Sequence, residues 1–425
     1  MPALITTDDT QYALEIVKQI CTEVGPGVAG SAQEQERAEM IKSELAVHLG
    51  AGNVHVEEFT LAPGAFLGAQ AVSTVLMAIA ALLNIFTSRS PGVLPWYTAV
   101  SSLFLAVTAI LLFLCEFVLG YELVDPLFKK KQSLNVIGTL RRPGSQNVER
   151  LLMLSGHHDS ALEFTWLHYT GYGYFLLSIT WLVALITVLV LSIIQLAGLL
   201  AGNADIVRLG TPGWGLLAYP IAPSIIYAMF FNMEKKNGGT VPGAVDNLSA
   251  CAVTVAMCRT LVNNPDLIHA DTEIRFVTFG SEEAGCRGSR RYVARHREEL
   301  KRLSVRLLNY EMIAHPEIAI LTSETNGTVK ICPEMVKSLV AAAERAGVPY
   351  RVQPATLGTA SDAGPFSRAG FMAATLFPFK SPQQMVAFYH QRQDSPEVLT
   401  IEPLRNVLKL TLEWIRTGGE QAKKL

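Results

Sequence analysis

The stretch RLLMLSGHHDS, residues 150–160, is an apolar run that ends in two histidines and an aspartate. Its unbroken hydrophobicity is typical of a strand covered on both faces. The run TEIRFVTFG, residues 272–280, has the same character and is followed by a glutamate pair. Because helical patterns alternate with such runs, the sequence predicts an α/β fold. We expect a mixed, largely parallel central sheet with helices on both faces.

The remaining elements of this fold follow the same alternation. Further strands are expected at 54–61, 133–140, 305–313 and 371–379, and helices at 10–48 (a pair around a turn), 247–263, from about 288, 333–346 and 400–417. The sequence RRPGSQN joins the strand at 133–140 to the strand at 150–158. Its Pro and Gly favour a hairpin-type connection between these two strands.

Charged residues are distributed unevenly along the 425 residues. They make up 17% of the chain, below the quarter or so that is usual for a soluble protein. The deficit comes from four windows without any charge: 59–88, 90–115, 164–204 and 209–233. The sequence therefore predicts a water-soluble domain into which an α-helical transmembrane bundle is inserted.

Four segments in these windows are candidates to cross a membrane, which takes about 20 apolar residues. They are 65–86, 94–115, 174–200 and 214–231, the last being short and interrupted by two prolines. Four crossings place both termini on one side. Lysines follow the second and fourth candidates, at 129–131 and 235–236, whereas the opposite loops offer only Arg89 and Arg208. The positive-inside rule then predicts an integral membrane protein whose soluble domain and termini are cytoplasmic.

The composition also excludes some classes of function. The net charge is −2 and no basic stripe is present, so nucleic acid is not expected as a partner. The six cysteines are scattered and form no CxxC pair, which argues against a disulfide scaffold. The lipid bilayer is an expected partner, and an oligomer is compatible with the sequence.

Imidazole and carboxylate groups follow several of the predicted strands, where open α/β sheets place their sites. They are His157 and Asp159 in SGHHDS, Asp246 in GAVDN, Glu282 and Glu283 in TFGSEEAG, Glu311 in NYEMI and His390 in FYHQ. Each alone has an ordinary structural explanation, such as a helix N-terminus or a turn. Histidine with several carboxylates, however, is a ligand set that suits a divalent metal such as zinc.

In this order, and together with SDAGPF, these motifs resemble the two-zinc exopeptidases of the aminopeptidase Y and bacterial leucyl aminopeptidase type. Glutamate carboxypeptidase II and the glutaminyl cyclases are relatives of that family. The resemblance covers nearly all of the soluble segments, but the helix pairs are not part of its pattern. It implies catalytic segments at 1–62, 126–163 and 234–425, with inserted helix pairs at 63–125 and 164–233.

The resemblance also implies a role for each site residue. His157 and Glu311 would bind one zinc ion, Glu283 and His390 the second, and Asp246 would bridge both. Asp159 would orient the His157 imidazole, and Glu282 would be the general base for a metal-bound water. Asp362 would have a supporting role. Where this chain has Glu311 the family usually has aspartate, which puts the geometry of the first zinc site in question.

These roles predict a membrane-anchored zinc-dependent hydrolase of peptide or amide bonds, foremost an aminopeptidase. Two alternatives stay open. One is a hydrolase of N-acyl or lipid-linked amides at the membrane interface, because the second helix pair is inserted between the His157 and Asp246 motifs. The other is an inactive membrane scaffold of the same fold. The sequence leaves open the substrate side chain, exo- versus endo-cleavage and the physiological metal.

Overall fold

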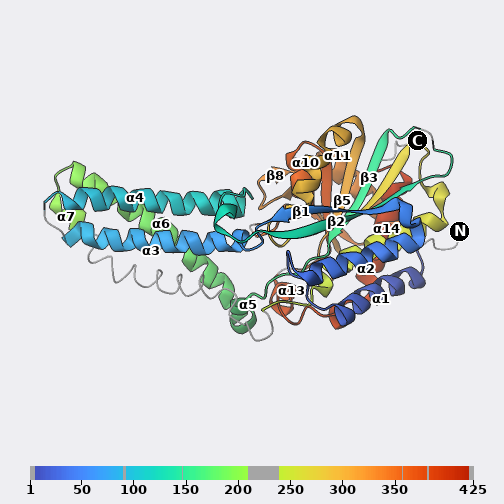
Figure 1. Cartoon of the computed structure of the whole chain (residues 1–425), viewed down its shortest axis with the longest axis horizontal. Helices are drawn as coiled ribbons and strands as arrows, with labels where there is room; N and C mark the ends of the chain where they lie inside the picture. The colour runs from blue at the N-terminus through green and yellow to red at the C-terminus, as the bar shows by residue number, and fades with distance from the viewer. Residues whose placement is uncertain are drawn as a thin grey trace. The chain divides into compact units, whose positions relative to one another are not determined.

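The computed structural model describes residues 5–89, 92–145, 147–208, 239–356, 358–380 and 382–420. The chain forms two compact units, each built from separate segments (Figure 1). The sheet unit comprises 1–63, 129–163 and 240–425, and the helix unit comprises 64–128 and 164–239.

An eight-stranded sheet forms the centre of the sheet unit, in the order β1-β2-β4-β3-β5-β10-β6-β9. Its strands are β1 (Val54–Leu61), β2 (Lys131–Arg141), β3 (Arg150–His157), β4 (Thr272–Phe279), β5 (Ser304–Tyr310), β6 (Ile318–Leu321), β9 (Tyr350–Gln353) and β10 (Met372–Phe377). The four inner strands β4, β3, β5 and β10 are parallel to one another. Strand β2 pairs antiparallel with β1 and β4, and β6 pairs antiparallel with β10 but parallel with β9, so the predicted mixed, largely parallel sheet is confirmed. A separate two-stranded sheet consists of β7 (Ser323–Glu324) and β8 (Val329–Lys330).

The predicted hairpin between β2 and β3 is wrong. The turn itself forms, since the Ser145 N–H donates to the Arg142 carbonyl at 3.1 Å. Strand β4 nevertheless lies between the two strands, antiparallel to β2 and parallel to β3. A local turn signal reports only the reversal of the chain, whereas β4, whose residues are all buried, is selected as the neighbour by packing on both of its faces.

Helices cover both faces of the sheet, as predicted. They are α1 (Thr7–Glu23), α2 (Ala32–Leu49), α9 (Ser249–Asn263), α10 (Arg287–Arg302), α11 (Pro333–Ala346), α12 (Ala363–Arg368), α13 (Gln383–Ala387) and α14 (Ile401–Arg416). Successive residues of β3 point to opposite faces. Leu152 and Leu154 join a core with α1, α2, α9, α11 and α14, whereas Leu151 and Met153 join one with α10 and α12.

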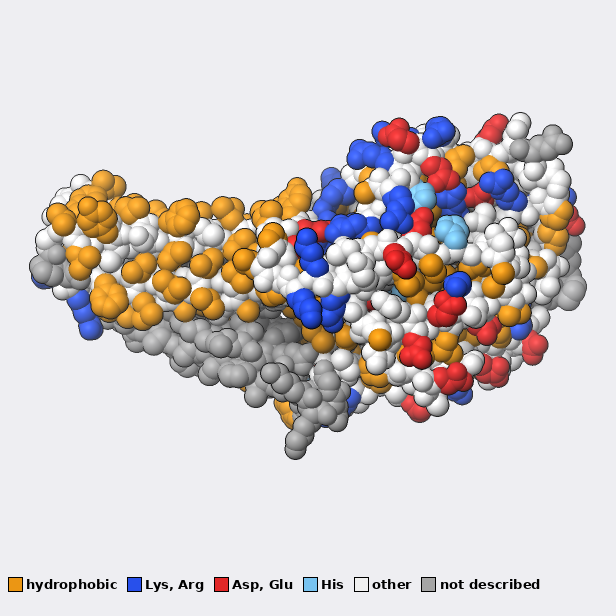
Figure 2. All heavy atoms as spheres, in the orientation of Figure 1, with side chains coloured by type: hydrophobic (Ala, Val, Ile, Leu, Met, Phe, Trp, Pro, Cys, Tyr) orange, Lys and Arg blue, Asp and Glu red, His pale blue; other side chains and the backbone are white. Residues whose placement is uncertain are grey.

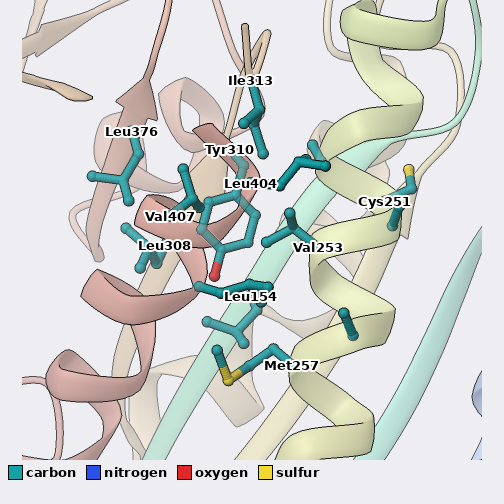
Figure 3. Close-up of a cluster of buried hydrophobic side chains, with 14 of the residues drawn as sticks. Leu154, Cys251, Val253, Met257, Leu308, Tyr310, Ile313, Leu376, Leu404 and Val407 are labelled. Carbon is teal, nitrogen blue, oxygen red and sulfur yellow. The ribbon is translucent and has the colours of Figure 1, made fainter. Parts of the chain in front are cut away.

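Part of the larger core is drawn in Figure 3. Leu154 of β3 and Met257 of α9 lie close to Tyr310, and Val407 of α14 approaches from the other side. Tyr310 is fully buried, and its hydroxyl is 3.0 Å from that of Thr411. This packing holds the C-terminal end of β5 in place, directly before the predicted ligand Glu311.

The helix unit contains three long apolar helices in its described part. They are α3 (Ala65–Arg89), α4 (Leu94–Leu112), which continues into the π-helix η2 (Phe113–Val118), and α6 (Gly173–Leu200); α5 (Thr165–Thr170) and α7 (Ala204–Arg208) are short. Helices are thus found where the first three spans are predicted. The fourth predicted span, 214–231, lies outside the described residues.

Four described helices are long and apolar enough to cross a membrane, by length and composition. Three are those of the helix unit, whose most apolar windows are only 22–33% buried. The fourth, Ala244–Asn263, is 89% buried and forms part of the sheet unit's core. Its apolar character is therefore explained by packing within the protein.

Candidate metal centre

The predicted site residues come together at the C-terminal ends of the parallel strands. His157 ends β3, Glu311 directly follows β5, and Glu282 and Glu283 lie in the loop after β4. Asp246 comes from the irregular turn η5 (Ala244–Leu248) before α9, and His390 from the turn after α13. All of the predicted ligands, together with Glu282, belong to groups whose ligand atoms lie within 4.8 Å of one another.

Asp246 lies at the centre of this cluster. Its Oδ1 is 3.3 Å from Nε2 of His157, and its Oδ2 is 3.2 Å from Nε2 of His390. Each histidine also contacts a glutamate: His157 Nε2 is 3.6 Å from Glu311 Oε2, and His390 Nε2 is 3.2 Å from Glu283 Oε1. Asp246 therefore presents one carboxylate oxygen to His157 and Glu311 and its other oxygen to His390 and Glu283.

These spacings match the ligand shell of zinc. Nitrogen and oxygen ligands about 2.1 Å from a tetrahedral ion lie about 3.4 Å from one another. The four distances between the histidine nitrogens and carboxylate oxygens run from 3.2 to 3.6 Å. Two zinc ions would fit, the first held by His157, Asp246 and Glu311 and the second by Asp246, Glu283 and His390.

Glu282 lies beside the first group. Its Oε2 is 3.8 Å from Nε2 of His157, further than the oxygens of Asp246 and Glu311. The thiol of Cys286 donates to Glu282 Oε1 at 3.1 Å. The sequence assigned no role to this cysteine, which lies four residues after the glutamate, at the end of the loop that leads into α10 (Arg287–Arg302).

Asp159 contacts both His157 and the loop that carries Glu282 and Glu283, here called the glutamate loop. Its Oδ1 is 3.3 Å from Nδ1 of His157. Its two oxygens also accept the backbone N–H groups of Glu282, at 2.9 Å, and Glu283, at 3.1 Å. The buried Asp159 carboxylate is therefore placed to hold the backbone of two site residues as well as an imidazole.

The side chain of Glu311 is held at both oxygens. The Asn309 amide donates to Oε1 at 2.9 Å, and the Asn247 amide donates to Oε2 at 2.7 Å. Asn309 is itself fixed by the Ser155 hydroxyl, 2.6 Å from its Oδ1. Neither asparagine was predicted from the sequence to take part in the site. The signal was available for Asn309, because residues two apart on a strand share a face.

Glu34 of α2 accepts a hydrogen bond from the residue that precedes the glutamate pair. The hydroxyl of Ser281, whose φ is +56°, donates to Glu34 Oε1 at 2.7 Å, and the hydroxyl of Ser133 donates to the same atom at 2.9 Å. Burial raises the pKa of Glu34 to about 8, and the charge of Asp159 adds to the effect. Residues far apart in sequence thus set the backbone immediately before Glu282.

Electrostatics within the cluster favour a bound cation. Burial, with a smaller effect from neighbouring carboxylates, raises the pKa of Glu282 well above its usual range and raises those of Glu311 and Asp362 to about 7. For Asp246 burial is outweighed by the two histidines, which lower its pKa. For His157 burial is outweighed by hydrogen bonds to carboxylates, which raise its pKa well above the usual range. Divalent cations would relieve the repulsion among these carboxylates.

Comparison with known proteins shows similarity to a family of peptidases. Residues 232–415 match peptidase family M28. The chain is 32% identical to aminopeptidase YwaD of Bacillus subtilis over 189 residues, which are 43% of this chain and 39% of that protein. It thus spans about two fifths of the length of this curated relative. The M28 match contains Asp246, Glu282, Glu283, Glu311 and His390 but begins after His157 and Asp159.

Solved structures show the same fold. A zinc aminopeptidase from Bacillus subtilis superposes with a TM-score of 0.53 at 17% identity, covering 98% of this chain and 96% of that one. A glutaminyl cyclase from an Acidobacteriales bacterium superposes with a TM-score of 0.54 at 13% identity, covering 99% and 96%. The family resemblance expected from the motifs is confirmed: residues 232–415 match peptidase family M28, and the chain has the fold of the zinc aminopeptidases and glutaminyl cyclases.

Proposed function

We propose that this chain is a membrane-anchored zinc aminopeptidase. The observation that carries the proposal is the position of Asp246, which offers one oxygen to the group of His157 and Glu311 and the other to the group of Glu283 and His390. A carboxylate shared in this way suits two ions a few ångströms apart. The similarity to aminopeptidase YwaD and to a zinc aminopeptidase structure supports the choice of substrate class.

Zinc, when bound, would polarise the scissile carbonyl and lower the pKa of a water molecule. Glu282 would take the proton of the attacking water and return it to the departing amine. We assign this role to Glu282 because it lies 3.8 Å from His157 Nε2, outside the distances of the two closer carboxylates. Asp159 would keep the base in place through the N–H of Glu282.

Replacing the base separates chemistry from metal binding. Glu282→Gln removes the proton acceptor but no zinc ligand, so kcat on aminoacyl amides should fall about 10²- to 10⁴-fold. Zinc content should stay at the wild-type value. Glu283→Gln is the matched control one residue away, and it should lose zinc because it removes the charged carboxylate that contacts His390 beside Asp246. Activity of Glu282→Gln within tenfold of wild type would disprove the base assignment.

A second substrate class is favoured by where the helix unit is inserted. The chain leaves the sheet unit after Glu163 and re-enters it at Thr240, close in sequence to the ligands His157 and Asp246. A site entrance near a bilayer would suit N-acyl or lipid-linked amides. For such substrates kcat/KM should rise about fourfold per added methylene, from about 0.8 kcal/mol each. A flat series of chain lengths in nanodiscs would favour the plain aminopeptidase, and no turnover by zinc-loaded protein would favour an inactive scaffold.

The proposed membrane orientation has a direct test. The lysines at 129–131 and 235–236 place the sheet unit and both termini in the cytoplasm by the positive-inside rule. Cysteine introduced at Arg89 or Arg208 should therefore react with an impermeant thiol reagent on intact cells, and cysteine introduced near the C-terminus should not. The reverse labelling pattern would invert the orientation.

A further inference from the structure

Asp394 has no assigned role, yet it contacts the segment that carries the central ligand. Its carboxylate is fully buried and accepts the backbone N–H of Val245 at 2.7 Å and of Asp246 at 3.1 Å, one on each oxygen. Its backbone carbonyl accepts the N–H of Ala244 at 3.2 Å. Three successive backbone amides of the turn Ala244–Leu248, here called the Asp246 turn, thus donate hydrogen bonds to one residue.

The Asp246 turn needs such acceptors because its backbone is irregular. Asp246 has φ −111° and ψ 87°, which is not a helical conformation, although the turn leads directly into α9. The turn is fully enclosed, with Ala244 and Val245 at 0% exposure. A buried N–H without an acceptor costs about 1–3 kcal/mol, so the carboxylate of Asp394 stabilises the turn in the conformation that presents Asp246.

Asp394 is itself seated in the turn that carries His390. Its N–H donates to the carbonyl of Gln391 at 2.9 Å. The side-chain amide of Gln391 donates to the carbonyls of Met385 and Val386, at 3.2 and 3.0 Å, which closes this turn onto α13. Asp394 therefore joins the turn that carries His390 to the turn that carries Asp246, and Asp246 itself lies 148 residues before Asp394 in the sequence.

Asp159 contacts the glutamate loop in the same way. It accepts two successive N–H groups, those of Glu282 and Glu283, just as Asp394 accepts those of Val245 and Asp246. We propose that Asp394 is a positioning residue that holds the Asp246 turn against the His390 turn and so sets the spacing of Asp246, Glu283 and His390 for the second metal ion. The inference rests on the proposed function in that this group binds zinc.

The test measures zinc affinity of the full-length protein in detergent by competition with a chelator. Asp394→Ala should weaken the second zinc about 10- to 100-fold, the usual effect of removing a group that orients metal ligands. Asp394→Asn keeps the volume and one acceptor oxygen, so its loss should be smaller. The absorption spectrum of the Co²⁺-substituted protein should change in both variants, because the ligand geometry changes.

Asp9→Asn is the matched control. Asp9 is also a buried aspartate that accepts a backbone N–H, that of Thr6 at 2.9 Å, but it caps α1 and belongs to none of the ligand groups. The Asp9→Asn substitution should lower the melting temperature of the metal-free protein without changing its affinity for zinc. If Asp394→Ala does not fold, Asp394→Asn still provides the measurement.

The positioning role would be overturned if Asp394→Asn, and Asp394→Ala where it folds, bound both zinc ions with wild-type affinity. Wild-type protein that binds no zinc would instead reject the proposed function on which the inference rests.

Discussion

The two units of this protein expose opposite kinds of side chain. In the helix unit large apolar residues are exposed along the three long helices, among them Val75, Ile79, Phe86, Val100, Phe104, Leu111, Ile179, Val183, Ile186 and Ile193. Figure 2 shows one face of this unit, on which hydrophobic side chains predominate. The interior of the helix unit contains a polar network in which Asn84, Ser102 and Ser192 hydrogen-bond to one another across α3, α4 and α6. In the sheet unit the apolar residues form the core and most charged residues are outside.

The difference is consistent with the proposed membrane anchoring of the helix unit. Exposed apolar helices around a neutral hydrogen-bonded interior suit a lipid environment, where polar side chains join helices. The sheet unit buries carboxylates and imidazoles together, an arrangement that is costly unless a counter-charge such as a metal ion is present. The buried charge described in the helix unit is Glu116, near the end of η2, whose carboxylate accepts the N–H of Leu123 at 2.7 Å.

The largest expected effect comes from the central ligand of the sheet unit. Asp246→Asn puts a neutral amide between His157 and His390, and zinc affinity should fall by more than about 100-fold, the upper range for merely orienting groups. Because Asp246 belongs to both ligand groups, both ions should be lost. Metal analysis by mass spectrometry and aminoacyl-amide turnover provide the readout. Two tightly bound zinc ions in this variant would contradict the bridging role.

A matched pair of substitutions tests the contrast between the two surfaces. Ile186, 58% exposed near the middle of α6, and Val352, 46% exposed on β9, are both replaced by arginine. Ile186→Arg should impair membrane insertion, at about 2.5–3.5 kcal/mol for a charge at the bilayer centre. Val352→Arg should stay within about 0.5 kcal/mol, as surface changes do. The fraction of protein in washed membranes measures both, and equal fractions would mean that α6 does not face lipid.

The smallest effect tests how the sheet unit accommodates Glu311. Asn309→Ala removes the donor to Glu311 Oε1, and affinity for the first zinc should fall about 10- to 100-fold. Asn406→Ala removes another buried amide, which donates to the Pro316 carbonyl at 2.9 Å and takes no part in the ligand groups. Both variants should lose about 1 kcal/mol of stability. Unchanged zinc affinity in Asn309→Ala would show that Asn247 alone holds the glutamate.

Much of the sheet could be predicted because its inner strands are continuous apolar runs. Strands β3 and β4 end within a residue of their predicted ends. The four-residue strands β6 and β9 were missed, since such short segments leave no clear period. The order of β2, β4 and β3 in the sheet could not be predicted from the sequence either, because it depends on which strand is buried on both of its faces.

For the site, the sequence by itself determined the residue types of the proposed ligands and their places near the ends of strands. Charge-free windows of 25 residues or more likewise predicted the helix unit. A helix that crosses a bilayer needs about 20 consecutive apolar residues, and a run of that length can be found from the composition alone. Only the tertiary structure decided that Asp246 faces both histidines, that Asn247 holds Glu311, and that Asp394 joins the Asp246 and His390 turns. Hydrogen bonds between residues 60–150 positions apart leave no local pattern, because the chain's folding, and not its spacing, brings the partners within reach.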